Sequence, residues 1–189
     1  MEKIKVDNLS FSYPSSDKLA LDSVSLSIPE SEFVVLCGKS GCGKSTLLRH
    51  LKKSMNPYGN KFGSVCFDGE EIEEMNDRDA ASKIGYVQQN PDNQLVTDKV
   101  WHELAFGLES LGYSNSVIKR RVAEMASYFG IQTWFRKSVS ELSGGQKQLL
   151  NLASVMAMQP KVLILDEPAS QLDPIAARDF LSTVHRLNR

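Results

Sequence analysis

Hydrophobic residues change their spacing along this chain, and each spacing predicts a different kind of element. Over 4–11 and 19–28 they alternate with polar residues, which predicts strands with one buried face. The segments Phe33–Cys37 and Lys161–Asp166 each carry an unbroken apolar run, as is typical of strands buried on both faces. Further short strands are expected over 63–69 and 84–88.

Helical spacing dominates the remaining segments. Ser114 is expected to cap a helix, and Pro160 to end one. The last helix would bury a stripe of Ala177, Phe180, Leu181 and Val184. Strands that alternate with helices around two apolar strands predict an α/β fold with a mainly parallel central sheet. The expected helices lie over 46–55, within 100–135, over 145–158 and from Pro174 onward.

The charge balance narrows the possible partners. The 189 residues include 22 Lys+Arg and 23 Asp+Glu, and 22 − 23 gives a net charge of −1. This balance argues against a polybasic nucleic-acid binder, so no nucleic-acid partner is expected. With 41% hydrophobic and 24% charged residues, the chain has the composition of one globular domain.

Signals for secretion or membrane insertion are not expected. No apolar stretch approaches the roughly 20 residues needed to cross a bilayer, and the N-terminus leads into no signal-peptide region. Three cysteines without metal-ligand spacing indicate a reduced, cytosolic compartment. Any membrane role would therefore depend on a partner.

One segment fits the phosphate-binding pattern G-x-x-x-x-G-K-[ST] at every fixed position. It lies between an expected strand and an expected helix, so its backbone N–H groups and the helix N-terminus would face a phosphate. Lys44 would reach the β- and γ-phosphates, and the Ser45 hydroxyl would bind Mg²⁺. The alternative is a glycine-rich turn that matches by chance, and Cys42 is either a redox switch or simply a small residue. The loop comprises Gly38, Lys39, Ser40, Gly41, Cys42, Gly43, Lys44 and Ser45.

Two adjacent carboxylates, Asp166 and Glu167, end the second apolar strand. Desolvating them is costly, and the carboxyl ends of strands in a doubly wound sheet line the ligand crevice. Asp166 would therefore join the Mg²⁺ ligands, and Glu167 would act as general base on the attacking water. The alternative is a strand that simply ends in two solvated acids.

A third motif, Leu142–Gln146, reads LSGGQ directly before an expected long helix, where a serine cap and two glycines would suit an anion. With this string about 100 residues after the phosphate loop and about 20 before the carboxylates, the sequence resembles the ATP-binding cassette (ABC) ATPase family over nearly the whole chain. The resemblance implies a P-loop NTPase fold with an N-terminal antiparallel β region and an inserted helical subdomain. A single domain of 1–189 would consist of a core, 1–98 and 159–189, and a helical subdomain, 99–158.

The resemblance also implies roles for single residues in binding ATP. Tyr13 is similar to the aromatic residue that stacks on adenine, and Thr46 would follow the phosphate loop along the nucleotide. Gln89 is similar to the catalytic Q-loop glutamine, although Gln88 competes for that place. For Tyr13 the alternative is an ordinary aromatic on an edge strand. The Mg²⁺ ligands that the resemblance implies are Ser45, Gln89 and Asp166.

Family members form head-to-tail dimers in which the signature of one subunit acts on the nucleotide bound by the other. The implied partner is a second ABC ATPase subunit, identical or different. Asp173 resembles the D-loop aspartate and would lie at the same seam. The signature residues implied to contact the partner's nucleotide are Ser143, Gly144, Gly145 and Gln146.

Two further segments, Gln89–Gln94 and 103–109, resemble those of energy-coupling factor (ECF) transporters and of cobalt or nickel importers. In that branch the region receives the coupling helices of a membrane subunit, so 89–108 would form a groove with exposed Leu95 or Val96. The implied partners are an integral membrane coupling subunit and a substrate-binding membrane subunit, at the cytoplasmic face of the cell membrane. The alternative is that the first segment is an ordinary polar turn.

The last residues depart from the family pattern, which places a switch histidine about 30 residues beyond the D-loop. The chain ends at Arg189, 189 − 173 = 16 residues after Asp173. His185 is expected at the surface, and His50 and His102 come too early. A cassette without its C-terminal end, which binds ATP but hydrolyses it slowly, is therefore expected.

Together these features predict the ATP-binding subunit of a micronutrient importer, for a vitamin or a transition-metal ion. Two other functions remain open. One is an ABC ATPase without a transport role, which long inserts or basic arms would favour. The other is an ATP-gated dimerisation module without efficient hydrolysis, against which Glu167 argues.

Overall fold

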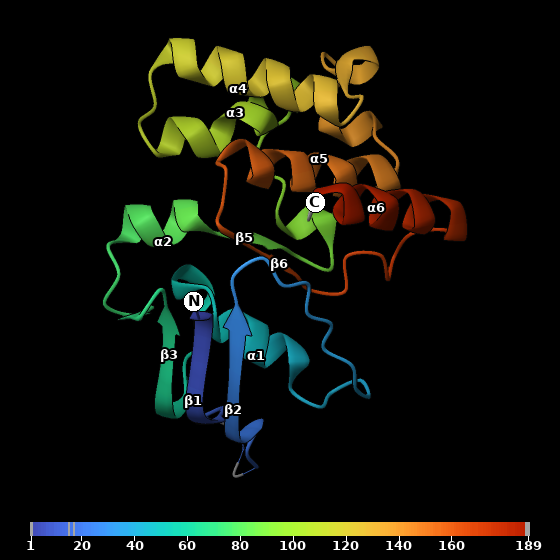
Figure 1. Ribbon diagram of the computed structural model, residues 1–189. Coiled ribbons are helices and arrows are strands. Elements are labelled where there is room, and N and C mark those ends of the chain that lie inside the picture. The colour runs from blue at the N-terminus through green and yellow to red at the C-terminus, as the bar shows by residue number, and fades with distance from the viewer. Residues whose placement is uncertain (1, 15, 17, 188–189) are drawn as a thin grey trace. The chain divides into compact units, whose positions relative to one another are not determined.

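A computed structural model describes residues 2–14, 16 and 18–187. The chain folds into two compact units, Met1–Ala81 and Ser82–Arg189. Figure 1 shows strands β1 (Glu2–Ser12), β2 (Leu21–Pro29) and β3 (Asn60–Phe67) in the first unit, and a helical layer in the second. The predicted division into a core and a helical subdomain remains a prediction.

The N-terminal unit is built on an antiparallel sheet with the strand order β2-β1-β3-β4, whose edge is β4 (Glu70–Glu71). The alternation predicted over 4–11 is confirmed, because Ile4, Val6, Leu9 and Phe11 of β1 are all buried. The single helix predicted over 46–55 is two shorter pieces. The helices of this part are α1 (Lys44–His50), η1 (Lys53–Met55) and α2 (Asp77–Lys83), which runs into the second unit.

A bulge interrupts the alternation of β1. The buried residues Val6 and Leu9 are three positions apart, and the pairing with β3 shifts between Asp7 and Ser10. On β3, Gly63 faces this bulge with φ +84°, and a Cβ built there would lie 2.4 Å from the Asn8 carbonyl oxygen. The bulge therefore requires glycine at this position of β3.

The strand predicted over Phe33–Cys37 is wrong. This segment is irregular chain outside any ladder, and Phe33, Val34 and Val35 are 57%, 47% and 67% exposed. An apolar run indicates burial, but a strand forms only where a neighbouring strand takes up its N–H and C=O groups. Among the described residues of the N-terminal unit, no strand pairs with it. The phosphate loop therefore follows irregular chain and not a buried strand.

The second unit begins with a parallel pair of strands, β5 (Ile84–Val87) and β6 (Val162–Leu165), in register from Ile84↔Val162 to Val87↔Leu165. A parallel pair needs a long crossover, and the helices between the strands provide it. The helices are η2 (Pro91–Asn93), α3 (Val100–Ser110), α4 (Asn115–Tyr128), η3 (Gln132–Trp134), η4 (Val139–Glu141), α5 (Gly144–Ala157) and, after β6, α6 (Pro174–Leu187).

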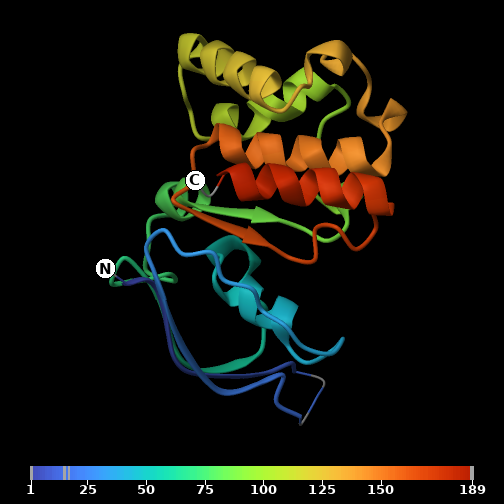
Figure 2. The same ribbon diagram turned by 45° about the vertical axis from the view of Figure 1, so that its right-hand side comes forward.

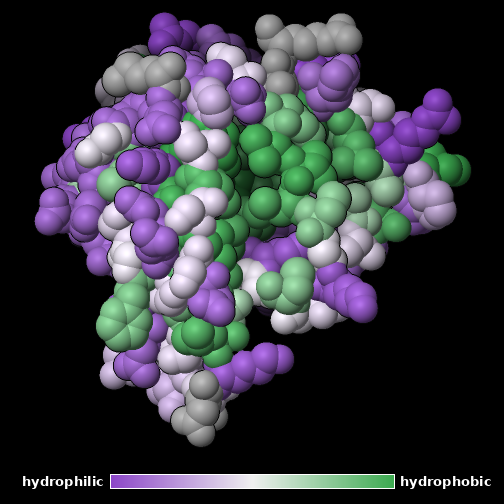
Figure 3. All heavy atoms as spheres, turned by 60° about the horizontal axis from the view of Figure 1, so that its bottom comes forward, coloured by the Kyte–Doolittle hydropathy of each residue, from purple (hydrophilic) through white to green (hydrophobic). Residues whose placement is uncertain are grey.

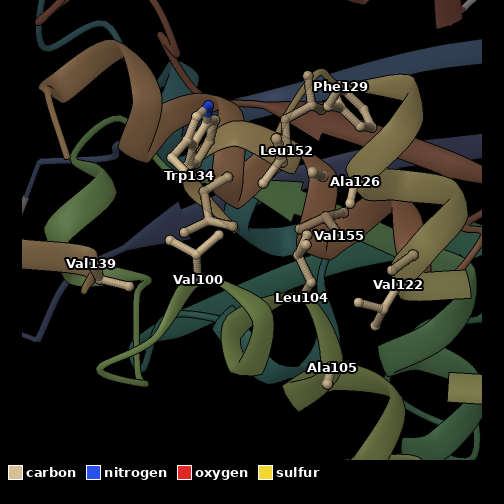
Figure 4. Close-up of a cluster of buried hydrophobic side chains, with 14 of the residues drawn as sticks. Val100, Leu104, Ala105, Val122, Ala126, Phe129, Trp134, Val139, Leu152 and Val155 are labelled. Atoms are coloured by element: carbon tan, nitrogen blue, oxygen red, sulfur yellow. The ribbon is translucent and has the colours of Figure 1, made fainter. Parts of the chain in front are cut away.

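Helices α5 and α6 lie side by side over the two parallel strands, and α3 and α4 pack on α5 (Figure 1, Figure 2). Figure 4 shows side chains of α3, α4 and α5 pointing toward one another, among them Leu104, Val122 and Leu152. Leu104 and Leu152 are fully buried, so this cluster is the core of the unit. Burial of these side chains stabilises the helical layer, at roughly 25 cal/mol per Å² of apolar area removed from water.

Most elements predicted for this unit are confirmed, with three corrections of detail. Ser114 occupies the N-cap position of α4, but its hydroxyl lies 3.1 Å from Ser116 Oγ and makes no capping bond. On α6, Leu181 is 52% exposed and Thr183 is buried, because the helix packs through the side that carries Phe180. Strand β6 is mostly half-buried, since it belongs to a sheet of only two strands.

None of the described helices is long and apolar enough to span a membrane. Green side chains at the surface in Figure 3 show that apolar residues are not confined to the two cores. The three cysteines are free thiols, with Cys37 and Cys42 exposed and Cys66 half-buried.

Candidate functional site

The phosphate loop curls around the end of the Lys44 side chain. Lys44 Nζ donates to the carbonyl oxygens of Gly38 and Lys39, at 3.1 and 3.2 Å. Gly43 has φ +96°, and a Cβ there would lie 2.4 Å from the Ala20 carbonyl oxygen, so the turn requires glycine. Residues 38–42 are exposed, so the loop amides and the ammonium are accessible to an anion.

Tyr13 lies directly beside the helix that follows this loop. Its hydroxyl is 3.1 Å from Thr46 Oγ1, and the edge of its ring packs on Phe11 with centroids 4.9 Å apart. His50, one turn after Thr46, donates from Nδ1 to the Thr46 carbonyl at 2.8 Å, and burial lowers the pKa of its imidazole. These contacts fix the Tyr13 ring at both ends, although it stays half-buried and accessible.

In the second unit, the ends of β5 and β6 bring three predicted residues together. Gln89 Nε2 donates to Glu167 Oε2 and to Ser170 Oγ, each at 3.2 Å. Glu167 is exposed and has a left-handed backbone, φ +44°, a conformation that costs about 1–3 kcal/mol for a residue with a side chain. Beside it, Asp166 is only 6% exposed and accepts from Tyr86 Oη at 2.9 Å.

The signature begins helix α5 with a reciprocal capping box. Ser143 Oγ accepts from the Gln146 N–H at 3.3 Å, and Gln146 Oε1 accepts from the Ser143 N–H at 3.0 Å. This serine cap was expected, and it is confirmed. No heavy atom lies within 4 Å of a Cβ built on Gly144, whereas one on Gly145 would lie 3.1 Å from Ala176 Cβ. The signature is therefore open on one side and packed on α6 on the other.

Asp173 has a structural task that the sequence did not indicate. Its Oδ1 accepts from the backbone N–H groups of Ile175 and Ala176, both at 3.0 Å, and so caps α6. Because Ala176 also borders Gly145, the D-loop and the signature are neighbours in this unit.

The segment that follows Gln89 is a short, well-braced turn. Asn90 caps η2 by accepting from the Asp92 N–H at 3.0 Å, as the polar-turn alternative expects. Glu103, 4% exposed, accepts from the N–H groups of Val96 and Thr97 at 3.1 and 2.8 Å. Val96 is 65% exposed, as predicted, whereas Leu95 is half-buried against the core, so its predicted exposure is wrong.

Of the three histidines, His102 and His185 are at least partly exposed. His185 is exposed, which confirms its predicted place. His102 stacks on Trp101, with centroids 5.2 Å apart, and lies 3.4 Å from a Glu109 oxygen.

The predicted site residues thus form two groups, one in each unit. The N-terminal group holds Tyr13, Thr46 and the phosphate loop, and the second holds Gln89, the carboxylates, the signature and Asp173. The amino-acid sequence itself identifies the family. The sequence profile of the ABC transporter family matches residues 21–170, most of the chain.

The chain belongs to the ABC transporter family.

Two ABC relatives and one solved ABC structure illustrate the kinship. A protein of Bacillus thuringiensis subsp. konkukian, named as an ABC transporter ATP-binding protein, is 51% identical over 184 residues, 97% of this chain and 33% of that protein. The energy-coupling factor transporter ATP-binding protein EcfA1 of Latilactobacillus sakei is 39% identical over 98% of this chain and 65% of its own length. The structure of cbiO1 from Clostridium perfringens, part of the ABC transporter complex cbiONQ, matches with TM-score 0.85 and 30% identity over 100% of this chain and 74% of that one.

These ABC relatives confirm two predictions, the resemblance to cassettes of the ECF and cobalt-importer type and the P-loop NTPase fold class. The chain spans about a third of the length of the first curated relatives that it matches. The roles of single residues in this ABC chain stay predictions.

Sequence reasoning missed Tyr86, which contacts Asp166, and it missed the contact of Ser170, a residue of the D-loop stretch 170–173, with Gln89. A buried tyrosine needs a partner for its hydroxyl, so Tyr86 in a short apolar strand carried a signal. Nothing in the sequence indicated the contact of Ser170 with Gln89, because this contact depends on how the chain turns after β6.

Proposed function

We propose that this chain is the ATP-binding and ATP-hydrolysing part of an ECF-type ABC importer that takes up a vitamin or a transition-metal ion. The observation that carries the proposal is the contact of Gln89 with Glu167, beside the buried carboxylate of Asp166. A glutamine and a carboxylate at adjoining strand ends suit the orientation and deprotonation of an attacking water.

The N-terminal unit would bind the nucleotide. Lys44, which now donates to two loop carbonyls, would exchange them for phosphate oxygens, and a charge-assisted contact of this kind is the stronger one. The loop N–H groups from Gly38 to Ser45 and the Thr46 side chain would complete the phosphate cradle. The accessible ring of Tyr13 would stack on adenine.

The donor atoms suit Mg²⁺. Among the described residues, no three His, Cys, Asp or Glu side chains gather as a metal cluster. Mg²⁺ is ordinarily held by one or two carboxylates together with substrate phosphates, so the oxygens of Ser45, Gln89 and Asp166 would be ligands of a suitable type. The hydrogen bond from Tyr86 would hold one oxygen of the Asp166 carboxylate in place. When bound, Mg²⁺ would neutralise charge on the phosphates.

Glu167 would then take the proton of the attacking water. Its side chain is exposed, so water reaches it, and its bond to Gln89 Nε2 holds one carboxylate oxygen in place. Gln89 would orient the same water, and Ser170 would hold Gln89. Signature residues Ser143–Gln146 and Asp173 would act at the nucleotide of a second cassette.

The importer role rests on the relatives and on the segment after Gln89. EcfA1 is named as the ATP-binding protein of an energy-coupling factor transporter, and cbiO1 as part of an ABC transporter complex, which supports assembly of this chain with further subunits at a membrane. The exposed apolar side chains Val96 and Trp101 suit contact with a coupling helix. The chain would thus be peripheral to the membrane.

Co-purification with the membrane subunits tests this role. We expect wild type to assemble and Val96→Asp to assemble at least about tenfold less, with ATP affinity unchanged. Tyr128→Asp, at an apolar position of α4 that is 47% exposed, is the control and should assemble normally. If wild type does not assemble while it hydrolyses ATP, the importer role is wrong and the ATPase role stands.

A further inference from the structure

Helix α5 carries two amide side chains that have no solvent contact at all. Gln148 and Asn151 are each 0% exposed, although neither belongs to the signature. Gln148 Nε2 donates to the Gln88 carbonyl at 3.0 Å, and Asn151 Nδ2 donates to the Pro91 carbonyl at 3.2 Å. The two acceptors lie on either side of Gln89, so α5 holds the backbone of this segment at both ends.

Stability alone does not account for these amides. Gln148 Oε1 and Asn151 Oδ1 are buried and have no hydrogen-bond partner. A buried polar atom without a partner is costly, and an apolar side chain of similar volume would avoid that cost. The value of each amide must therefore lie in the bond that its N–H makes to the backbone beside Gln89.

A third contact joins the same two segments at the surface. Lys147 Nζ lies 2.6 Å from Asp92 Oδ1, but the Asp92 side chain is 63% exposed. Exposed ion pairs contribute little, so the two buried amides are the stronger part of the connection. The Gln94 side chain braces the same segment from within, because it accepts from the Gln88 N–H and donates to the Tyr86 carbonyl, both at 2.9 Å.

We propose that Gln148 and Asn151 are positioning residues that fix helix α5 to the segment 88–91, so that the signature and Gln89 move as one piece. Ser143 caps the same helix about one and a half turns before Gln148, and an α-helix transmits displacement along its axis. A displacement of Gln89 would therefore reach the signature. This inference rests on the proposed function, because it assigns the connection to ATP hydrolysis.

The test replaces Gln148 by Met, which has a similar volume and no polar atoms to satisfy. We expect kcat for ATP hydrolysis in the assembled complex to fall about tenfold or more, a typical coupling effect. The ATP dissociation constant should stay within about twofold, because the phosphate loop is unchanged. The melting temperature should change little, because the loss of the bond to the Gln88 carbonyl is offset by the removal of the unpaired oxygen. Gln132→Met, at an exposed position of η3, is the control and should keep the wild-type kcat.

In a second variant, the pH decides whether the bond to the Gln88 carbonyl can form. In Gln148→Glu, the introduced carboxyl can donate to the Gln88 carbonyl only when it is protonated, and full burial raises its pKa. Relative to wild type at each pH, its kcat should recover several-fold as the pH falls from 8 to 6. Gln132→Glu should show no such recovery. A purely space-filling role for Gln148 predicts that Gln148→Met, which fills the same volume, keeps the wild-type kcat.

Hydrogen exchange separates this inference from the proposed function. In Gln148→Met, backbone amides of 89–95 should exchange at least about tenfold faster than in wild type, while those of α4 are unchanged. If wild type does not hydrolyse ATP, the proposed function fails, and exchange still tests the connection. If wild type hydrolyses ATP and Gln148→Met keeps its kcat and its exchange rates, the inference is overturned.

Discussion

Among single residues, Tyr13 gives a specific test of nucleotide binding, because its ring is held by Phe11 and Thr46. We expect Tyr13→Ala to weaken ATP and ADP binding alike by about 1–3 kcal/mol, the usual range for stacking on a base. Binding of inorganic triphosphate should be unchanged, as calorimetric titration can measure. Tyr13→Phe keeps the ring and should bind all three like wild type. Equal affinities for Tyr13→Ala and wild type would contradict the stacking role.

Lys52 makes the stability of the N-terminal unit depend on pH. Its side chain is buried, and Nζ donates to the carbonyls of Ala80 and Ala81, each at 3.0 Å. Burial lowers the pKa of Lys52 from its ordinary value of 10.5 to about 8. Below pH 8 Lys52 is protonated in both the folded and the unfolded protein, so the folded protein carries the full cost of burying the charged ammonium. Between pH 8 and 10.5 the unfolded chain binds more protons than the folded one, so the contribution of Lys52 to stability rises with pH.

Urea unfolding at pH 7 to 10 checks this sign. The free energy of unfolding of wild type should rise relative to that of Lys52→Met as the pH increases from 8 toward 10.5. Lys119→Met removes an exposed ammonium from α4 and should show no such trend. A difference between wild type and Lys52→Met that stays constant over this range would show that the Lys52 pKa is not lowered.

Among the elements, the bulge of β1 depends on one glycine of β3. Gly63→Ala adds a Cβ only 2.4 Å from the Asn8 carbonyl oxygen, at a φ of +84°. Gly69→Ala imposes the same backbone strain at φ +85°, but no heavy atom lies within 4 Å of its Cβ. We expect Gly63→Ala to lower the free energy of unfolding by about 1–3 kcal/mol more than Gly69→Ala, measured in urea. Equal losses would mean that the bulge can relax without cost.

Elements with a strong period were predictable, because their pattern also specifies the surface that they bury. Helix α6 begins at Pro174 as expected, and its buried side chains Phe180 and Val184 follow the helical period. The segment Phe33–Cys37 was not predictable as a strand, because an apolar run does not specify a partner. The bulge in β1 was equally hidden, since it depends on Gly63 of a distant strand.

For the candidate site, the order of the sequence motifs predicted which residues belong to the site, and the chemistry of single residues added less. The Gln89 contact with Glu167 follows from two parallel strands that end at the same edge. The amides of Gln148 and Asn151 could not be foreseen, because nothing in the sequence shows which carbonyl a buried amide reaches. The sequence therefore predicts which residues gather and not how they are held.

At the scale of the whole molecule, the proposed sandwich of two cassettes can be tested through the exposed Ser143. Ser143→Arg adds bulk and charge where the partner's nucleotide would lie, so ATP-dependent dimerisation should be lost. ATP affinity of the phosphate loop should change less than about threefold. Light scattering with and without ATP distinguishes the monomer from the dimer. Ser127→Arg, on the exposed side of α4, is the control and should dimerise like wild type. A Ser143→Arg variant that dimerises like wild type would refute the sandwich.

The central claim, that this chain hydrolyses ATP with Glu167 as general base, is tested most directly by steady-state phosphate release. Glu167→Gln retains the size of the side chain but cannot accept the proton, so the rate should fall about 10²- to 10⁴-fold while ATP affinity is kept. Glu124→Gln, at an exposed site of α4, should release phosphate at the wild-type rate. Phosphate release by Glu167→Gln at the wild-type rate would contradict the claim.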